Sequence, residues 1–113
     1  MVDATDNLFS RYVINDACIK LGKPFVYGSI CEFEGQVSVF NYQGGPNYRD
    51  LYEYHEGIKD FSQPLGVIGA LPGVVGSIQA TETLKIILER QDTLSGHLLL
   101  IDLLKGNFRK LKI

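Results

Sequence analysis

The start of the chain constrains its fold most, because residues 3–7, DATDN, read as the end of a strand followed at once by the start of a helix. Asp6 or Asn7 can cap a helix that the apolar spacing predicts over about residues 8–21. The β-forming run at residues 25–31 then predicts a second strand. A strand, a helix and a strand in this order form one crossover between parallel strands, which indicates an α/β fold. The residues at three-, four- and seven-residue offsets on the apolar face of this helix are Ile14, Ala17, Cys18 and Leu21.

A carboxylate at such a strand end has a chemical use. Open α/β sheets bind ligands just beyond the ends of their strands, where Asp6 can hold a metal ion or a cation bound to phosphate. A nucleotide needs more than this carboxylate, above all a glycine-rich turn that leads into a helix. No such turn precedes residue 3 in this sequence. We therefore expect the nucleotide-binding half of the site to be absent, and DATDN to be the other half.

The middle of the chain predicts an antiparallel pair of strands. The run at residues 25–31 is nearly all apolar or small, which is typical of a strand covered on both faces. Glu34-Gly35 predicts a turn, and residues 36–42 predict the next strand. Alternation assigns the apolar side chains of that strand to two faces, with Val37 and Val39 on one and Phe40 and Tyr42 on the other.

The second half of the chain predicts one long helix and a hairpin, after a long loop at residues 43–63. The glycine-rich run at residues 66–76 leads into a helix that extends to about Arg90, and its first turns are expected to be wholly buried. Residues 97–103 and 108–113 predict two strands joined by a turn that contains Gly106. The long helix is expected to turn an apolar stripe of Ala80, Leu84, Ile87 and Leu88 to the core, opposite Gln79, Glu82, Lys85 and Glu89.

Charge and composition exclude several classes of protein. The chain has 113 residues, of which 45% are hydrophobic and 21% charged, and a formal net charge of −2. This balance suits one small domain over residues 1–113 and gives no basic patch for nucleic acid. No apolar stretch reaches the ~18 residues of a membrane span, and no signal peptide is found. Cys18 and Cys31 lie within predicted elements, which is typical of packed cysteines in a reducing cytoplasm.

With these elements in place, the chain resembles a known family. The segments that carry the resemblance are DATDN with the following Arg11, LGKPFVYGSI, FEGQVSVFNY, GPNYRDL and GVIGALPGVVGSIQATETLKI. Together they resemble the C-terminal half of the ThiF/MoeB and ubiquitin-activating adenylyltransferases. The resemblance spans nearly all 113 residues. It implies half of a Rossmann-like fold, with a mixed sheet and two main helices.

The resemblance also implies a reaction. Members of the family use ATP and Mg²⁺ to adenylate the C-terminal glycine of a ubiquitin-like sulfur carrier, in molybdopterin or thiamine biosynthesis. This implies ATP and Mg²⁺ as cofactors of an intact enzyme, a sulfur-carrier partner and a homo-oligomer. The isolated chain is expected to be inactive and to bind no cofactor, because the nucleotide-binding half is missing. The alternative is a non-catalytic partner or interaction subunit related to the family.

Two residues match the catalytic pattern of the family. Asp6 matches the acidic residue of its TDN motif, which holds Mg²⁺ and the α-phosphate during adenylation, and Arg11 matches an arginine on the helix that follows. Attack of a carboxylate on an α-phosphate joins two anions, so a cation must offset their repulsion. On local sequence alone, Asp6 is more commonly a helix N-cap, worth ~1 kcal/mol. The family match favours the metal ligand in an intact enzyme.

Departures from the family pattern predict lost chemistry. Asn47 and Asp50 stand where the family has two of its four zinc-binding cysteines. An amide and one carboxylate cannot replace four thiolates, so we expect no structural zinc. The residues between them, Tyr48 and Arg49, are expected to pin the loop. A loop cysteine for sulfur transfer is also missing near Ser62, which predicts no such chemistry there.

Other residues that suggest a site have simpler explanations. The glycines of the run at 66–76 lack the lysine of a phosphate-binding loop, so they predict close packing of the helix that follows. The two histidines, His55 and His97, lack the paired spacing of a metal site and are expected at the surface. The glycines in question are Gly66, Gly69, Gly73 and Gly76.

Overall fold

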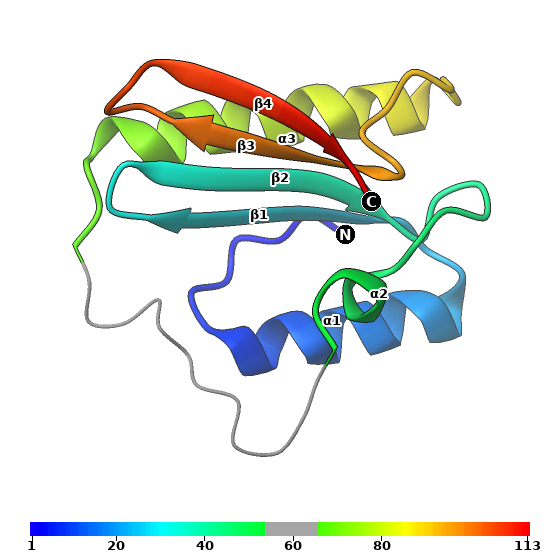
Figure 1. The fold of residues 1–113 in the computed structure, drawn as a ribbon. Coiled ribbons are helices and arrows are strands. Elements are labelled where there is room, and N and C mark those ends of the chain that lie inside the picture. The colour runs from blue at the N-terminus through cyan, green and yellow to red at the C-terminus, as the bar shows by residue number, and fades with distance from the viewer. Residues whose placement is uncertain (54–65) are drawn as a thin grey trace.

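A computed structural model of the chain describes residues 1–53 and 66–113 (Figure 1). The helices are α1 (Leu8–Leu21), α2 (Tyr48–Leu51) and α3 (Ala70–Ile87), and the strands are β1 (Phe25–Cys31), β2 (Glu34–Phe40), β3 (His97–Asp102) and β4 (Asn107–Lys112). The predicted bounds of α1 and β1 and the predicted hairpin are confirmed to within a residue or two. Among the described residues, no helix combines the length and the apolar character needed to cross a bilayer.

The four named strands form one antiparallel sheet in the order β1-β2-β3-β4. A short parallel addition makes the sheet mixed, because Val2 forms an isolated bridge with Val26 of β1. The Asp3 N–H donates to the Val26 carbonyl at 2.9 Å, and the Val26 N–H donates to the Met1 carbonyl at 2.8 Å. The predicted crossover from residues 1–3 through α1 to β1 is therefore confirmed.

Helices cover the two faces of this sheet, α1 with α2 on one side and α3 on the other (Figure 1). The two helical layers bury separate apolar clusters because side chains alternate along each strand. The cluster under α1 and α2 contains Tyr12, Cys18, Phe25, Tyr27, Phe40, Tyr48 and Leu98. The cluster under α3 contains Val37, Val39, Leu71, Val75, Leu94 and Ile101.

The turn between β1 and β2 corrects one sequence prediction. It lies at residues 32–33, where Glu32 has a positive φ of 54°, and Glu34 and Gly35 already belong to β2. Gly35 is not a turn residue but leaves space for the approach of α3 to β2. A Cβ atom at this position would lie 2.7 Å from Cγ2 of Val75 in α3. Glycine therefore marks here the close approach of a helix to a strand.

The buried face of each long helix differs from the predicted one, in part for α1 and fully for α3. In α1 Cys18 is buried and Ile14 packs half-buried against the core, whereas Ala17 and Leu21 are exposed. In α3 the expected apolar stripe is exposed. Polar side chains take the buried positions because they bond backbone groups that would otherwise lack partners. The buried residues are Arg11, Tyr12, Asn15 and Cys18 in α1, and Leu71, Val75, Gln79 and Glu82 in α3.

The outer face of α3 corrects two further predictions. Its first turns are buried on one side only, and a Cβ atom added at Gly73 or Gly76 would meet no atom within 4 Å. The expected close packing through these glycines is therefore wrong within this chain.

Tyr42 lies on the opposite face of the sheet from the one predicted. It follows Asn41, whose φ is 54°, and packs with Val37 and not with Phe40.

Candidate functional site

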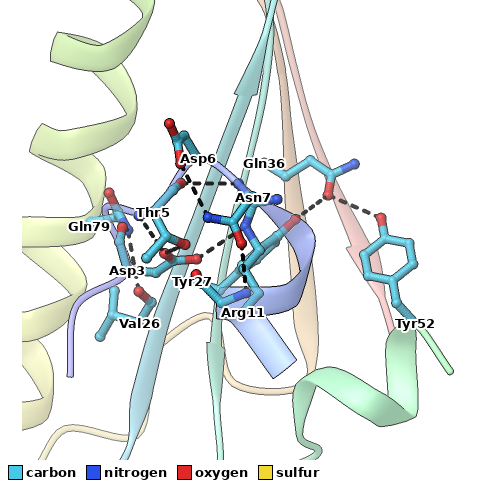
Figure 2. Close-up of polar contacts among 11 residues, drawn as sticks. Asp3, Thr5, Asp6, Asn7, Arg11, Val26, Tyr27, Gln36, Tyr52 and Gln79 are labelled. Atoms are coloured by element: carbon cyan, nitrogen blue, oxygen red, sulfur yellow. Dashed lines mark hydrogen bonds and ion pairs between the residues drawn. The ribbon is translucent and has the colours of Figure 1, made fainter. Parts of the chain in front are cut away.

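A polar network fixes the turn at residues 3–7, where the first parallel segment ends and α1 begins (Figure 2). Asp3 is 1% exposed, and its Oδ1 accepts hydrogen bonds from the Thr5 N–H at 2.8 Å and the Thr5 hydroxyl at 2.6 Å. Its Oδ2 lies 3.3 Å from Nε of Arg11. The buried carboxylate is thus compensated by one charge and two local donors, as a buried charge requires.

Asp6 lies on the exposed side of this turn. The next residue, Asn7, is the N-cap of α1, because its side chain accepts from the Ser10 N–H at 2.9 Å. Of the two caps that the sequence allowed, Asn7 is the one formed. Asn7 Nδ2 also donates to Asp6 Oδ1 at 3.3 Å. Asp6 therefore presents a carboxylate to solvent beside the N-terminus of α1.

Arg11 is buried, with 5% of its surface exposed. Its Nε contacts Asp3, its Nη2 donates to the Thr5 carbonyl at 3.3 Å, and its Cζ lies 5.8 Å from the ring centroid of Tyr27. These contacts tie α1 back to the turn from which it starts. The guanidinium is thus used within the fold, in support of the turn that carries Asp6.

An aromatic cluster adjoins Arg11 on the α1 side of the sheet. Gln36 Oε1 accepts hydrogen bonds from the hydroxyls of Tyr27 and Tyr52, both at 3.0 Å. Burial raises the pKa of Tyr27 to about 12 and also raises the pKa of Tyr48. Both phenols are therefore neutral at physiological pH, and the Tyr27 hydroxyl acts as a structural hydrogen-bond donor to Gln36.

The short helix α2 occupies the place where the resemblance implied a zinc loop. The Asn47 side chain accepts from the Arg49 N–H at 2.9 Å, and Asp50 Oδ2 accepts from the Asn47 N–H at 2.8 Å. The two residues thus form a capping box. Because both side chains already bind backbone donors of their own helix, they do not fit a zinc ion. Elsewhere in the described part of the chain, no three His, Cys, Asp or Glu side chains gather as a metal site.

Contacts from α2 to α1 confirm the expected pinning of this loop. Arg49 forms two hydrogen bonds of 2.8 Å with the carboxylate of Asp16, and these bonds lower the pKa of that carboxyl. The Arg49 guanidinium also lies 4.9 Å from the ring centroid of Tyr12. Asn15 Oδ1 accepts from the Tyr48 N–H at 2.8 Å. His55 and the position near Ser62 lie outside the described residues.

Sequence reasoning missed two members of the site. The sequence indicates Asp3 as a strand end but not as the partner of Arg11, although only eight residues separate the two. Gln79 was placed on the solvent face of α3, whereas its Nε2 donates to the Asp3 carbonyl at 2.7 Å. Gly28 is the sequence signal for this contact, because a glycine inside a strand often marks the close approach of another segment.

Comparisons with known proteins match the whole chain. A family model described as the ThiF family matches residues 1–113. The chain is 50% identical to a probable molybdopterin-synthase adenylyltransferase of Pyropia yezoensis over 116 aligned residues, which cover 100% of this chain and 31% of that protein. It is 46% identical to a sulfur carrier protein adenylyltransferase of Thermus thermophilus, covering 100% of this chain and 44% of the relative. The chain thus spans 31% and 44% of the lengths of these two relatives.

A solved structure is similar in fold. The crystal structure of E. coli MccB with AMPCPP and MccA superposes with a TM-score of 0.76 at 11% sequence identity. The match covers 98% of this chain and 35% of that one. At this identity the likeness concerns the arrangement of helices and strands.

Proposed function

Because the chain belongs to the ThiF family, we propose that it is the part of an ATP-dependent adenylyltransferase that presents Asp6 to Mg·ATP. In that reaction the C-terminal carboxylate of a sulfur-carrier protein attacks the α-phosphorus, an acyl-adenylate forms, and pyrophosphate leaves. The relatives named as molybdopterin-synthase and sulfur carrier protein adenylyltransferases support this proposal. The observation that carries it is the exposed carboxylate of Asp6 on a turn fixed by buried contacts.

The described residues fit Mg²⁺ in one particular way. Magnesium in nucleotide sites is commonly held by one or two carboxylates together with phosphate oxygens and water. Asp6 offers one such carboxylate, and it is exposed where a strand gives way to a helix. Bound Mg²⁺ would supply positive charge against the α-phosphate. Asp6 would hold and orient it, while Arg11 keeps the turn in place through Asp3.

The proposed partner is a ubiquitin-like sulfur carrier, and the proposed location is the cytoplasm. The nucleotide-binding residues would come from a part of the protein that corresponds to the unmatched length of the relatives. The 113-residue chain alone is therefore expected to catalyse no exchange of pyrophosphate into ATP. A non-catalytic partner subunit is the second candidate, because Asn47 and Asp50 serve a capping box where the family pattern has zinc ligands.

A chimera tests the function. Residues 1–113 replace the matching segment of the Thermus thermophilus relative, and pyrophosphate exchange is measured with ATP, Mg²⁺ and the sulfur carrier of that organism. We expect exchange that depends on the carrier. The variant Asp6→Asn should reduce its rate about 100-fold or more, because a group that stabilises the transition-state charge is lost. Asp92→Asn, a change at an exposed carboxylate beyond α3, is the control and should keep the rate.

Three outcomes would decide against parts of the proposal. A folded chimera that binds the carrier but exchanges no pyrophosphate would favour the non-catalytic partner. Equal rates for the Asp6→Asn and Asp92→Asn chimeras would remove Asp6 from the reaction. Robust exchange by the isolated 113-residue chain would show that the chain needs no further nucleotide-binding part.

The proposed homo-oligomer would form through the outer face of α3. Leu84, Ile87 and Leu88 are 60–70% exposed there, and Gly73 and Gly76 leave space for a close neighbour. A two-fold pair of such helices would bury both faces at once, since a two-fold interface uses the same surface on each copy. Helix-to-helix burial of this kind is apolar and changes little with salt.

Sedimentation of the chain at low and high salt tests the association. We expect a dimer or larger species at micromolar concentration, and a monomer for the double variant Leu84→Glu and Ile87→Glu. Val13→Glu introduces one such glutamate at a half-exposed apolar position of α1 and should leave the dimer intact. A monomer before any substitution, at both salt concentrations, would contradict the proposal.

A further inference from the structure

The side chain of Gln79 joins two segments that are far apart in the sequence. It lies on the buried face of α3 and is 6% exposed. Its Nε2 donates to the Asp3 carbonyl at 2.7 Å and to the Val26 carbonyl at 3.3 Å. Val26 is the residue that pairs with Val2 in the parallel bridge. One amide therefore holds the end of the first segment against β1, as Figure 2 shows.

The sheet leaves room for this side chain at Gly28 of β1. A Cβ atom at this position would lie closer than 3.0 Å to the Cδ, Oε1 and Nε2 atoms of Gln79. Gly28 has no positive φ, so the glycine is needed for space and not for backbone conformation. Any side chain at position 28 would displace the amide from the two carbonyls. Gly28 and Gln79 thus act as a pair.

Asp3 connects the Gln79 side chain to the turn at residues 3–7. Gln79 fixes its carbonyl from the α3 side of the sheet, while Thr5 and Arg11 hold its carboxylate. Asp6 follows three residues later on the same turn, on its exposed side. The backbone of Asp3 is therefore the point at which α3 can influence the direction of the Asp6 carboxylate.

We propose that Gln79 is a positioning residue, which couples α3 to the turn at residues 3–7 and thereby sets the orientation of Asp6. The structural part of this inference stands on the hydrogen bonds of Gln79 alone. Its catalytic part rests on the proposed function of Asp6. A glutamine that only fills a buried space would stabilise the whole fold equally and would have no particular effect on the turn.

Amide hydrogen exchange on the 113-residue chain separates these two roles. The readout is the exchange rate at the amides of Asp3 and Thr5, divided by the rate at Val37 in the centre of the sheet. Gln79→Met keeps the length of the side chain and removes the donor, so we expect the ratio to rise about tenfold or more. Glu82→Gln is the matched control. Glu82 is buried one turn later on α3 but bonds Leu94, so its ratio should stay unchanged.

A second pair of variants protects the test against simple misfolding. Gly28→Ala displaces the Gln79 side chain and should raise the same exchange ratio. Adding Gln79→Ala should relieve the steric conflict and recover stability without restoring protection of Thr5. Recovery of both stability and turn protection would overturn the proposal, as would an unchanged ratio in the folded Gln79→Met chain.

The catalytic part is read from the chimera described above. Gln79→Met should lower kcat for pyrophosphate exchange and raise the Mg²⁺ concentration needed for half-maximal rate, with the KM for the carrier unchanged. An unchanged kcat in a chimera whose turn has loosened would overturn the effect on Asp6. If the unsubstituted chimera is inactive, the proposed function fails, whereas the exchange ratio in the isolated chain still decides the role of Gln79 in the turn.

Discussion

Breaking the buried ion pair between Arg11 and Asp3 should cost a large part of the stability of the chain. The side chains of the pair are 6% and 0% exposed, so the substitution Arg11→Met leaves a carboxylate without a counter-charge in a dry setting. Removal of one partner of a buried pair typically costs ~3–5 kcal/mol. The two hydrogen bonds from Thr5 remain and place our expectation near the lower end, about 3 kcal/mol.

Urea unfolding followed by circular dichroism measures this loss, with Arg49→Met as the matched control. Arg49 also pairs with an aspartate, Asp16, but their side chains are 39% and 52% exposed. Exposed pairs are worth ~0–1 kcal/mol, so the control should lower the free energy of unfolding by less than about 1 kcal/mol. A similar loss for both variants would refute the argument that burial makes the first pair strong.

A double-mutant cycle completes the test. Asp3→Asn removes the charge of the carboxylate while retaining an oxygen that Thr5 can bond. The double variant Asp3→Asn with Arg11→Met should lose about 1–2 kcal/mol less than the sum of the single losses, because the second change no longer strands a charge. Additivity within ~0.5 kcal/mol would mean that the two groups do not stabilise each other.

Three further predictions concern pH, glycine and zinc. Because burial raises the pKa of Tyr27 to about 12 from its ordinary value of 10, its contribution to folding stability should be full below pH 10 and fall by about 3 kcal/mol as the pH rises to 12. Urea unfolding against pH measures this: Tyr27→Phe should lose less stability over this range than the unsubstituted chain, and its remaining loss comes from Tyr48, whose pKa burial also raises. An equally steep loss in Tyr27→Phe would contradict the prediction. Gly35→Ala should lower the free energy of unfolding by ~1–3 kcal/mol through its steric conflict with Val75, whereas Gly73→Ala, in open space within a helix, should raise it by up to ~1 kcal/mol. Thermal unfolding of the two variants measures the difference, and equal shifts in Tm would contradict the prediction. Metal analysis of chain purified without chelator should find no stoichiometric zinc, since Asn47 is engaged in its capping box; one zinc per chain, with unfolding on chelation, would overturn this.

Local signals were enough to predict where most elements begin and end. The cap at Asn7, the glycine after α1 and the turn before β4 act over a few residues, and the structure forms each of them. The parallel crossover also followed from the order of elements, and residues 1–3 do pair with β1. The start of β2 was missed because Gly35 was interpreted as a turn residue, whereas it makes room for α3.

The helix faces could not be predicted because the buried polar residues find their partners far along the chain. Gln79 bonds Asp3, 76 residues away, and Asn15 bonds Tyr48, 33 residues away. An amphipathic pattern has no information about such partners, and it assigns polar residues to solvent by default. Motif matching alone selects Asp6 and Arg11, and only the structure shows that the Asp6 carboxylate is exposed whereas the Arg11 guanidinium is buried.

The edge strand β4 has a consequence for how this chain behaves when it is crowded. Unpaired backbone groups along an edge invite a further strand, which is how many β proteins begin to aggregate. All six residues of β4 are exposed, and Arg109, Lys110 and Lys112 give it a dense positive charge in a chain whose net charge is −2. An identical edge brought alongside would set these cations against one another. This repulsion opposes the addition of further strands, so the edge of the sheet can remain unpaired without leading to fibre growth.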